Sequence, residues 1–303
     1  MSCRPRSGRR SQALHYRHRH GRSRRSPRRP RLRENQPVRR LVWDFGGAPV
    51  SAPISQSSAD ARLAGVATPA AKVPLHFAKG AQAAMEKLLR DCAAEESCRA
   101  EFPDLPENLA KVLATLDNGP VAFIIPHPKS REPQSGTMSR GVFAEHLKNL
   151  LYNLPSASLV PLLIQRAGRG DRTAFGRVVG GAPIHSTHAA ALGTYLTVTC
   201  SESIPFIDEN EIGSATEGTF MGDYRIRVHR QACREWRRGP IPAAYLEPVH
   251  SSVPVLMLSG ELDAATPPQL GPMPPNRFQN GRQILLRNNA HSYTSIPRTA
   301  PSA

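Results

Sequence analysis

Apolar residues recur at three- and four-residue spacing through the middle of the chain, a pattern typical of amphipathic helices. The first such run contains Phe77, Ala81, Met85, Leu88 and Cys92. Four later segments are also expected to be helical: Leu109, Val112, Leu113 and Leu116; Phe143, Leu147, Leu150 and Leu151; residues 159–167; and the Ala-rich residues 185–200. The pattern predicts helices from about 72 to 230 with no strand between them, as in an inserted helical lid rather than βαβ repeats.

Two apolar runs near the end of the chain favour strands instead. Residues 253–258 are apolar except for Pro254 and predict a fully buried strand that ends at a Ser-Gly turn. A second run, 283–286, also predicts a strand. Asp263 follows the first run and His291 follows the second. This is the chain order in which an α/β-hydrolase supplies the acid and the base of its triad.

The charge of the chain is concentrated at its beginning. The net charge is +16, but residues 1–40 hold 15 arginines, no lysine and one acid, a net of +14. Residues 41–303 therefore carry only +2, an ordinary balance for a globular domain. The first segment has little to bury, so we expect it to be disordered on its own. Such an arm could bind the phosphates of a nucleic acid, but its composition favours a solvated tail.

A third interpretation of this segment is a shifted reading frame. Arginine without lysine, mixed with Pro, Ser and His, is what a GC-rich gene yields out of frame. Shifting the back-translated codons by one base allows residues 38–46 to read Tyr-Gly-Gly-Ser-Tyr-Gly-Thr-Ser-Ala. That text contains Gly-x-Ser-x-Gly, the nucleophile elbow of α/β-hydrolases. We therefore hypothesise that residues up to about 62 are a frame-shifted hydrolase N-terminal half, with a second compensated shift at 271–280.

Several segments together resemble one family, the tripeptidyl-aminopeptidase-like serine peptidases, relatives of proline iminopeptidases within the α/β-hydrolase fold. The resemblance covers roughly residues 72–298. It rests on the following stretches: DCAAEESCRAEFPDL (91–105), 160–171, Thr199-Cys200-Ser201-Glu202, Cys233-Arg234-Glu235-Trp236, VPVLMLSGELDAATPP (253–268), Asn280-Gly281-Arg282 and Ala290-His291-Ser292.

The resemblance implies roles for two residues. Asp263 would be the triad acid that orients the imidazole, and His291 would be the general base. A turn or capping role for Asp263 and a surface-loop position for His291 stay open. The nucleophile is unknown, because the printed chain contains no Gly-x-Ser-x-Gly. The nearest candidate, Ser139, has Thr137 in place of the first Gly, and we expect it to lie on no strand-to-helix turn.

The resemblance also implies a use for the cysteines. None of the five lies in a Cys-x-x-Cys pair. In the family pattern Cys92 would pair with Cys98, and Cys200 with Cys233, which leaves Cys3 over. Four buried thiols in a cytosolic protein are the alternative. Disulfides suit a secreted or periplasmic protein, although the chain shows no signal-peptide-like stretch and no apolar run of the roughly 18 residues that span a membrane.

No metal or cofactor is expected. His185 and His188 have HxxH spacing, but no third ligand is evident, and a loop or core role is favoured. The implied substrate is a peptide or a small ester or amide.

The sequence thus predicts an α/β protein with a partial α/β-hydrolase fold. Residues 1–62 form the basic, disordered segment, 72–235 the helical lid and 245–303 the C-terminal core segment. The implied function is a serine exopeptidase that acts on peptide N-termini but is inactive as printed. The alternatives are a nucleic-acid-binding protein, or a non-functional fragment. The fragment would lack the first half of the sheet, so we expect the strand at 253–258 to have no neighbours.

Overall fold

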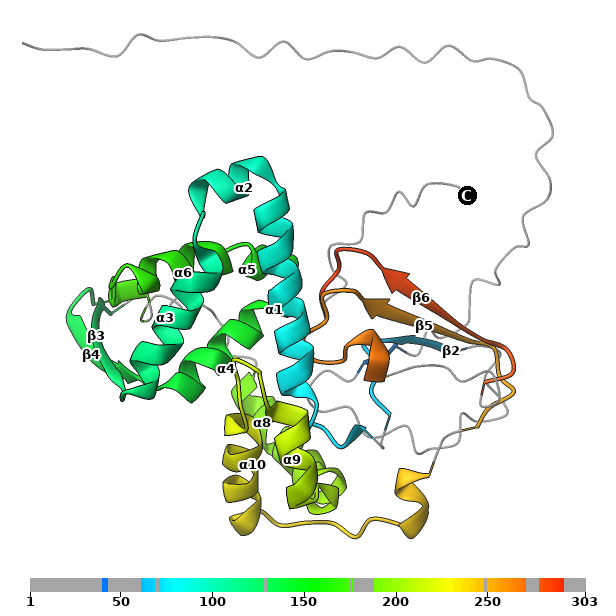
Figure 1. Ribbon diagram of the computed structural model, residues 1–303. Helices are drawn as coiled ribbons and strands as arrows, with labels where there is room; N and C mark the ends of the chain where they lie inside the picture. The colour runs from blue at the N-terminus through cyan, green and yellow to red at the C-terminus, as the bar shows by residue number, and fades with distance from the viewer. Residues whose placement is uncertain are drawn as a thin grey trace, which may run out of the picture. The chain divides into compact units, whose positions relative to one another are not determined.

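The structure is a computed structural model that describes residues 40–42, 61–68, 71–127, 130–174, 176, 188–247, 250–270 and 278–291. All of these belong to one compact unit, 38–303. The predictions made for the arginine-rich arm, for His185 and for most of the 271–280 segment lie outside the described residues. The elements, coloured along the chain in Figure 1, are β1 (Arg40–Val42), β2 (Ala61–Ala64), α1 (Phe77–Ala94), α2 (Glu96–Glu101), α3 (Leu105–Asp117), β3 (Val121–Pro126), β4 (Pro133–Met138), α4 (Arg140–Leu150), α5 (Leu154–Ala157), α6 (Val160–Gly168), α8 (His188–Glu202), η2 (Ile204–Phe206), α9 (Glu209–Thr216), α10 (Tyr224–Glu235), η3 (Ala243–Leu246), β5 (Val255–Gly260), η4 (Pro268–Leu270) and β6 (Gly281–Leu286).

Four strands form a parallel sheet in the order β1-β2-β5-β6. Strand β5 pairs with β2 on one side and with β6 on the other, with Leu258 opposite Ala64 and Ile284. The expectation that this strand would have no neighbours is therefore wrong. Its residues alternate between buried and half-buried positions, because both edges are paired and helices cover part of the sheet. The mixed α/β class predicted from the sequence is confirmed.

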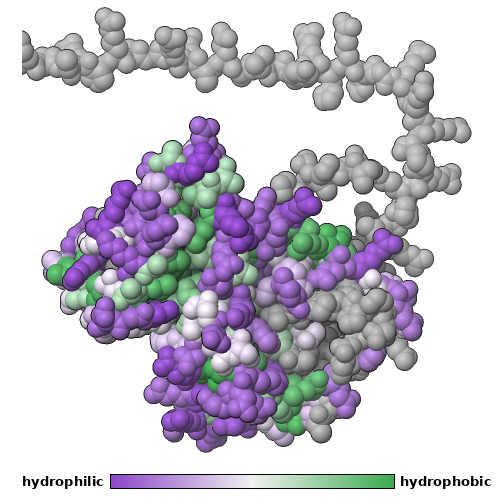
Figure 2. Space-filling model, viewed as in Figure 1, coloured by the Kyte–Doolittle hydropathy of each residue, from purple (hydrophilic) through white to green (hydrophobic). Residues whose placement is uncertain are grey.

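Strand β6 lies at the edge of this sheet and is less covered than β5. Ile284 and Leu285 have 47% and 50% of their surface exposed. On the face shown in Figure 2, such hydrophobic surface occurs in patches separated by hydrophilic residues.

The helices of the middle region share one hydrophobic core. The apolar faces of α1, α3, α4 and α6 meet there, and Met85, Leu147 and Ile164 are almost completely buried. These are among the positions that the three- and four-residue spacing predicts. Polar caps fix where individual helices begin: the hydroxyl of Ser139 accepts a hydrogen bond from the Val142 amide at the start of α4.

A second, smaller core joins α8, η2, α9 and α10 around the disulfide-bonded Cys200 and Cys233. Helix α9 begins with a reciprocal capping box between Asp208 and Glu211. The Glu211 carboxylate also pairs with Lys72 at 2.7 Å, which ties this group of helices to the segment that precedes α1.

One element contradicts the predicted all-helical middle region. Strands β3 and β4 form an antiparallel hairpin in which Val121 pairs with Met138 and Pro126 with Pro133. The hairpin packs on the helical core through Phe123 and Met138. Its second strand, PQSGTM, is mostly exposed and shows no apolar alternation, so the hydrophobic pattern could not reveal it. Among the described residues, no helix is long and apolar enough to cross a membrane.

Candidate active site

Two predicted site residues meet at the carboxyl ends of β5 and β6. The loops after these strands are bonded to each other through two backbone hydrogen bonds, from Glu261 N to Leu286 O at 3.0 Å and from Leu262 N to Asn289 O at 2.8 Å. Gly260 permits the close approach, since a Cβ there would lie 2.4 Å from the Ala290 carbonyl oxygen. Parallel strands place their carboxyl ends together, which is where open α/β sheets carry ligands and chemistry.

Asp263 is buried in a tight turn that it stabilises itself. Its Oδ1 accepts hydrogen bonds from the amides of Ala265 at 2.9 Å and Thr266 at 2.8 Å. Its Oδ2 accepts one from the Thr266 hydroxyl at 2.8 Å. The carboxylate is therefore held in one orientation by three donors of its own loop. The turn role left open for Asp263 is real, and the residue has a further contact as well.

That further contact is with His291. Its Nδ1 lies 2.9 Å from Oδ2 and 3.1 Å from Oδ1 of Asp263. An ionised carboxylate can only accept hydrogen bonds, so Nδ1 carries the proton in this bond. The in-plane lone pair of the neutral imidazole is then on Nε2. The side chain of His291 is only 8% exposed. His291 is therefore not an exposed surface-loop histidine, which was the alternative left open.

The environment of Asp263 keeps it ionised. Burial by itself raises the pKa of this carboxyl, but the hydrogen bond and charge of His291, with the amides of Thr266 and Ala265, more than offset the burial. The pKa of Asp263 is consequently below its ordinary value. A negatively charged partner on Nδ1 stabilises the protonated imidazole, which is what a general base needs when it accepts a proton.

The His291 ring is enclosed on two further sides. Gly65, just after β2, has φ +60°, and a Cβ there would lie 2.8 Å from His291 Cε1. Only a glycine allows the backbone to come this close. The Tyr152 ring, just after α4, makes a T-shaped contact with the imidazole, with centroids 5.1 Å apart and planes at 80°. The imidazole is thus positioned by a strand end, a turn and a helix end.

The sequence analysis missed the polar cluster behind Tyr152. Lys148 of α4 has a side chain with no exposed surface, and its Nζ donates to the Tyr152 hydroxyl at 2.8 Å. Its ammonium also lies 3.7 Å from Glu145 and 4.2 Å from the centroid of the Phe77 ring. Glu145 in turn forms an ion pair with Arg225 of α10. The spacing of apolar residues in α4 assigns Lys148 no particular role, because it follows directly on the buried Leu147.

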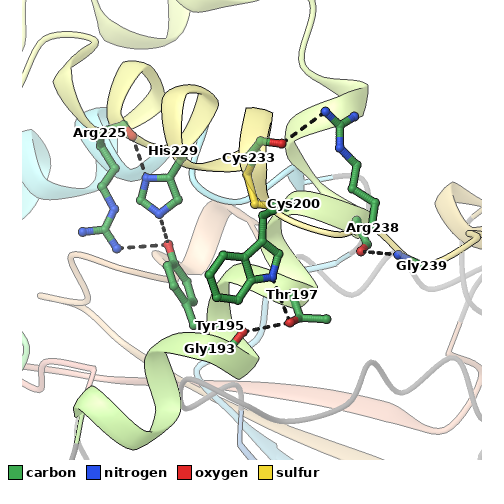
Figure 3. Close-up of a disulfide and its surroundings, with 11 residues drawn as sticks. Gly193, Tyr195, Thr197, Cys200, Arg225, His229, Cys233, Arg238 and Gly239 are labelled. Carbon is green, nitrogen blue, oxygen red and sulfur yellow. Dashed lines mark hydrogen bonds between the residues drawn. A yellow bond between two sulfur atoms is a disulfide. The ribbon is translucent and has the colours of Figure 1, made fainter.

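A second buried histidine lies between α8 and α10, near the Cys200–Cys233 disulfide (Figure 3). His229 Nδ1 donates to the Arg225 carbonyl at 2.7 Å, and the Tyr195 hydroxyl donates to Nε2, also at 2.7 Å. Arg225 donates to the same hydroxyl at 3.0 Å. Burial, and then the charge of Arg225, lower the pKa of His229 to about 4. Its Nε2 lone pair is already used, so this histidine is a neutral structural residue.

An apolar groove of about 380 Å³ lies beside the two loops. It includes Leu262 and Ala290, the residues that immediately precede Asp263 and His291. The rest of its wall comes from α1, α2, α5 and α6 and their connections, and includes the Cys92–Cys98 disulfide. Its volume falls in the range of small-molecule sites.

The structure joins the four cysteines in the pairs that the resemblance implies. Cys92 and Cys98 close the turn between α1 and α2, and their Cα atoms are 5.1 Å apart. Cys200 and Cys233 link α8 to α10 with a Cα separation of 5.2 Å. The described residues contain no cluster of three metal-ligating side chains.

The local geometry of Ser139 differs from the expectation. This serine does lie between a strand and a helix, because β4 ends at Met138 and α4 begins at Arg140. Helix α4 nevertheless separates it from the site: 11 residues at 1.5 Å each make roughly 16 Å to the end next to Tyr152. Ser139 is thus too far away to exchange a proton with His291.

The comparisons with known proteins bear on the C-terminal part of the chain. Residues 218–300 match the family model Abhydrolase_4, described as TAP-like protein. The match spans both strand ends and both residues of the Asp263–His291 pair, but less than half of the chain. No curated protein matches the chain significantly.

Proposed function

We propose that this chain derives from a serine hydrolase of the α/β-hydrolase superfamily that acts on peptide N-termini when its nucleophile is present. In this proposal Asp263 is the orienting acid and His291 the general base. The observation that carries it is the 2.9 Å contact between His291 Nδ1 and Asp263 Oδ2 at the ends of adjacent parallel strands. The TAP-like match over 218–300 supports the same assignment.

The geometry suits the base half of an acyl-transfer reaction. With Nδ1 bonded to the carboxylate, Nε2 takes the proton of a nucleophilic hydroxyl as that oxygen attacks the substrate carbonyl. The same Nε2 then returns the proton to the leaving amine, and a water repeats the sequence to release the acyl group. Asp263 remains ionised throughout and stabilises the charged imidazole. Both the nucleophile and the oxyanion donors have to come from other residues.

The printed sequence does not supply a nucleophile elbow, so we propose that this polypeptide does not turn over substrate. The shifted reading of residues 38–46 would restore Gly-x-Ser-x-Gly. Strand β1, Arg40–Val42, lies within this segment and is in the same sheet as the strands that carry the Asp263–His291 pair. The two disulfides support an oxidising compartment as the working environment.

The nucleotide sequence across codons 10–70 and 268–284 tests the proposal first. One continuous corrected frame with Gly-x-Ser-x-Gly would identify the active product as a serine hydrolase. That product should hydrolyse aminoacyl- or tripeptidyl-nitroanilides, and His291→Ala should remove the activity. If the corrected product with an intact elbow hydrolyses none of these substrates, the proposed function is wrong.

The polypeptide with the uncorrected sequence provides the complementary test. We expect no nitroanilide turnover above background from the purified polypeptide. Turnover that His291→Ala abolishes would contradict the proposed inactivity, because it would require a nucleophile other than an elbow serine. Turnover unaffected by His291→Ala would point to a contaminating enzyme.

A further inference from the structure

Lys148 has an unusual position for a lysine. Its side chain is completely buried, and its Nζ lies among Phe77, Glu145 and Tyr152. Buried lysines are rare unless they are paired. Two aromatic rings, of Phe77 and Tyr152, lie 4.2 and 4.6 Å from the ammonium and provide cation–π contacts. The ammonium donates to the Tyr152 hydroxyl at 2.8 Å, which fixes the hydroxyl end of that ring.

Tyr152 connects this lysine to the imidazole. Its ring meets His291 in a T-shaped contact, while its hydroxyl is held by Lys148. The two centroid distances, 4.6 and 5.1 Å, place the ammonium no more than about 10 Å from the centre of the imidazole.

Asp263 fixes only the Nδ1 side of the imidazole. A ring held at one edge can still tilt about the bond to its carboxylate, and a contact on another edge removes that freedom. Tyr152 supplies such a contact from the end of α4. Gly65 closes the Cε1 side through backbone atoms, since a Cβ there would lie 2.8 Å from that carbon.

We propose that Tyr152 and Lys148 are positioning residues for His291, through which helix α4 holds the imidazole against Asp263. This inference rests on the proposed function only for its catalytic meaning. The contacts themselves can be tested in the printed chain without any turnover.

The charges that face Lys148 make this contact sensitive to pH. Burial, and then the positive charge of Arg225 on α10, lower the pKa of Lys148 to about 7, whereas Glu145 on α4 and Asp263 raise it. The hydroxyl of Tyr152 stays neutral, because burial raises its pKa. Lys148 therefore loses its charge near neutral pH, in the range in which a histidine titrates. Lys148 thus donates to the Tyr152 hydroxyl as a charged ammonium below about pH 7 and as a neutral amine above it.

The experiment is an NMR measurement on the full chain with ¹³C- and ¹⁵N-labelled histidine, following Cε1–H and the low-field Nδ1–H proton of His291. His291→Gln identifies the resonances. Lys148→Met removes the donor to the Tyr152 hydroxyl, so the Cε1–H resonance of His291 should shift and the Nδ1–H proton should broaden. Glu145 keeps Arg225 as its partner in this variant, so no carboxylate is left alone.

A second variant tests positioning separately from charge. Tyr152→Leu should shift the Cε1–H resonance, because it removes the ring current of the aromatic edge. It should also broaden the low-field Nδ1–H proton that reports the bond to Asp263. Tyr152→Phe keeps the ring but loses the bond to Lys148, so it should broaden that proton less than Tyr152→Leu does.

Matched controls use a lysine and a tyrosine with other partners. Lys72→Met removes the ion pair with Glu211, and Tyr245→Phe removes the bond to Glu202. Neither should change the His291 signals.

The outcomes separate the two proposals. If Lys148→Met and Tyr152→Leu leave the Cε1–H resonance and the Nδ1–H proton of His291 unchanged while Asp263→Asn alters both, the positioning role is wrong and the Asp263–His291 pair stands. If Asp263→Asn also changes neither signal, the pair itself, and with it the proposed function, fails. Should Lys148→Met not fold, the result for Tyr152→Leu decides the question.

Discussion

The sheet edge and the helical region each bury one histidine in edge-to-face contact with a tyrosine. His291 meets Tyr152 with centroids 5.1 Å apart, and His229 meets Tyr195 at 5.4 Å. The Nδ1 partners differ. His291 bonds to the carboxylate of Asp263, whereas His229 bonds to a backbone carbonyl beside the cationic Arg225.

This difference separates a histidine fit for proton transfer from one that only holds structure. A carboxylate favours the charged ring, while a carbonyl with a nearby guanidinium disfavours it. The pKa of His229 accordingly falls to about 4. Its Nε2 also accepts the Tyr195 hydroxyl, so the lone pair that a base would use is engaged. Burial and an aromatic neighbour are common to both sites, so the role proposed for His291 rests on its charged Nδ1 partner.

The largest effect is expected when the Nδ1 partner of His291 is made neutral, as the Nδ1 partner of His229 is. Asp263→Asn replaces the carboxylate by a neutral amide and removes the charge that favours the protonated ring. In a frame-corrected product that carries the nucleophile, kcat/KM should fall about 10⁴-fold, the size found for the same change in a serine-protease triad. Nitroanilide kinetics measure it. Asp171→Asn is the control, since Asp171 also accepts the amide and hydroxyl of a following threonine, Thr173. A comparable loss in both variants would contradict the assigned role.

Acid should destabilise the protein through His229. In the unfolded chain this residue has a pKa of about 6.5, above its folded value of about 4. Between these values the unfolded state binds a proton that the folded state does not, so stability falls as the pH is lowered. The loss amounts to about 3 kcal/mol at pH 4. Urea unfolding from pH 7 to 4 measures it. His229→Phe, which keeps a ring beside Tyr195, should lose less stability over this range, and an unchanged slope would reject the explanation.

Gly65→Ala should lower the free energy of unfolding more than Gly222→Ala, although the two glycines have similar backbone conformations. Both Gly65 and Gly222 have positive φ, +60° and +55°, so each substitution costs about 1 kcal/mol in backbone strain. Only at Gly65 does the new Cβ meet His291, whereas at Gly222 nothing lies within 4 Å. We expect an additional 1 kcal/mol or so and a displaced His291 Cε1–H resonance. Equal unfolding energies and an unchanged resonance would show that the ring is not held there.

The smallest effect is expected at Thr266. Thr266→Val removes the hydroxyl that donates to Asp263 Oδ2 and should cost about 1 kcal/mol in urea unfolding. It should also raise the pKa of Asp263, because one donor to the charged form is lost. Thr115→Val, at an exposed hydroxyl that bonds within α3, should change stability less. A pKa of Asp263 that stays the same would mean that His291 and the two amides hold the carboxylate without the hydroxyl.

The residues of the candidate site could be predicted where local pattern carries the signal. Asp263 and His291 each follow an apolar run at the end of a strand, and most helices repeat apolar residues on the face that they bury. Lys148 could not be found this way. It lies between residues of a helix that has packing partners on several sides, and sequence spacing shows only that a helix has an apolar face.

Pairing between distant segments was likewise invisible. Strand β2 is four residues long, ARLA, with no β-branched residue, and one of its two partners, β5, lies almost 200 residues later. Only one strand of the hairpin could be recognised from the sequence. Val121–Pro126 contains a short apolar run, but its partner strand does not. A strand that depends on a remote partner leaves little trace in its own composition.

The pairing of β2 with β5 sets the order in which this chain can fold. The helices from α1 to α10 are all synthesised between the two strands, and their main cores consist of residues from that interval except for Ala264. They can collapse while β5 is still inside the ribosome. The pairing of β2 with β5 has to wait, since a loop of this length must close first. Asp263 and His291 come together only once β6 has been synthesised, and until β5 emerges β2 has one unpaired edge that a chaperone would need to shield.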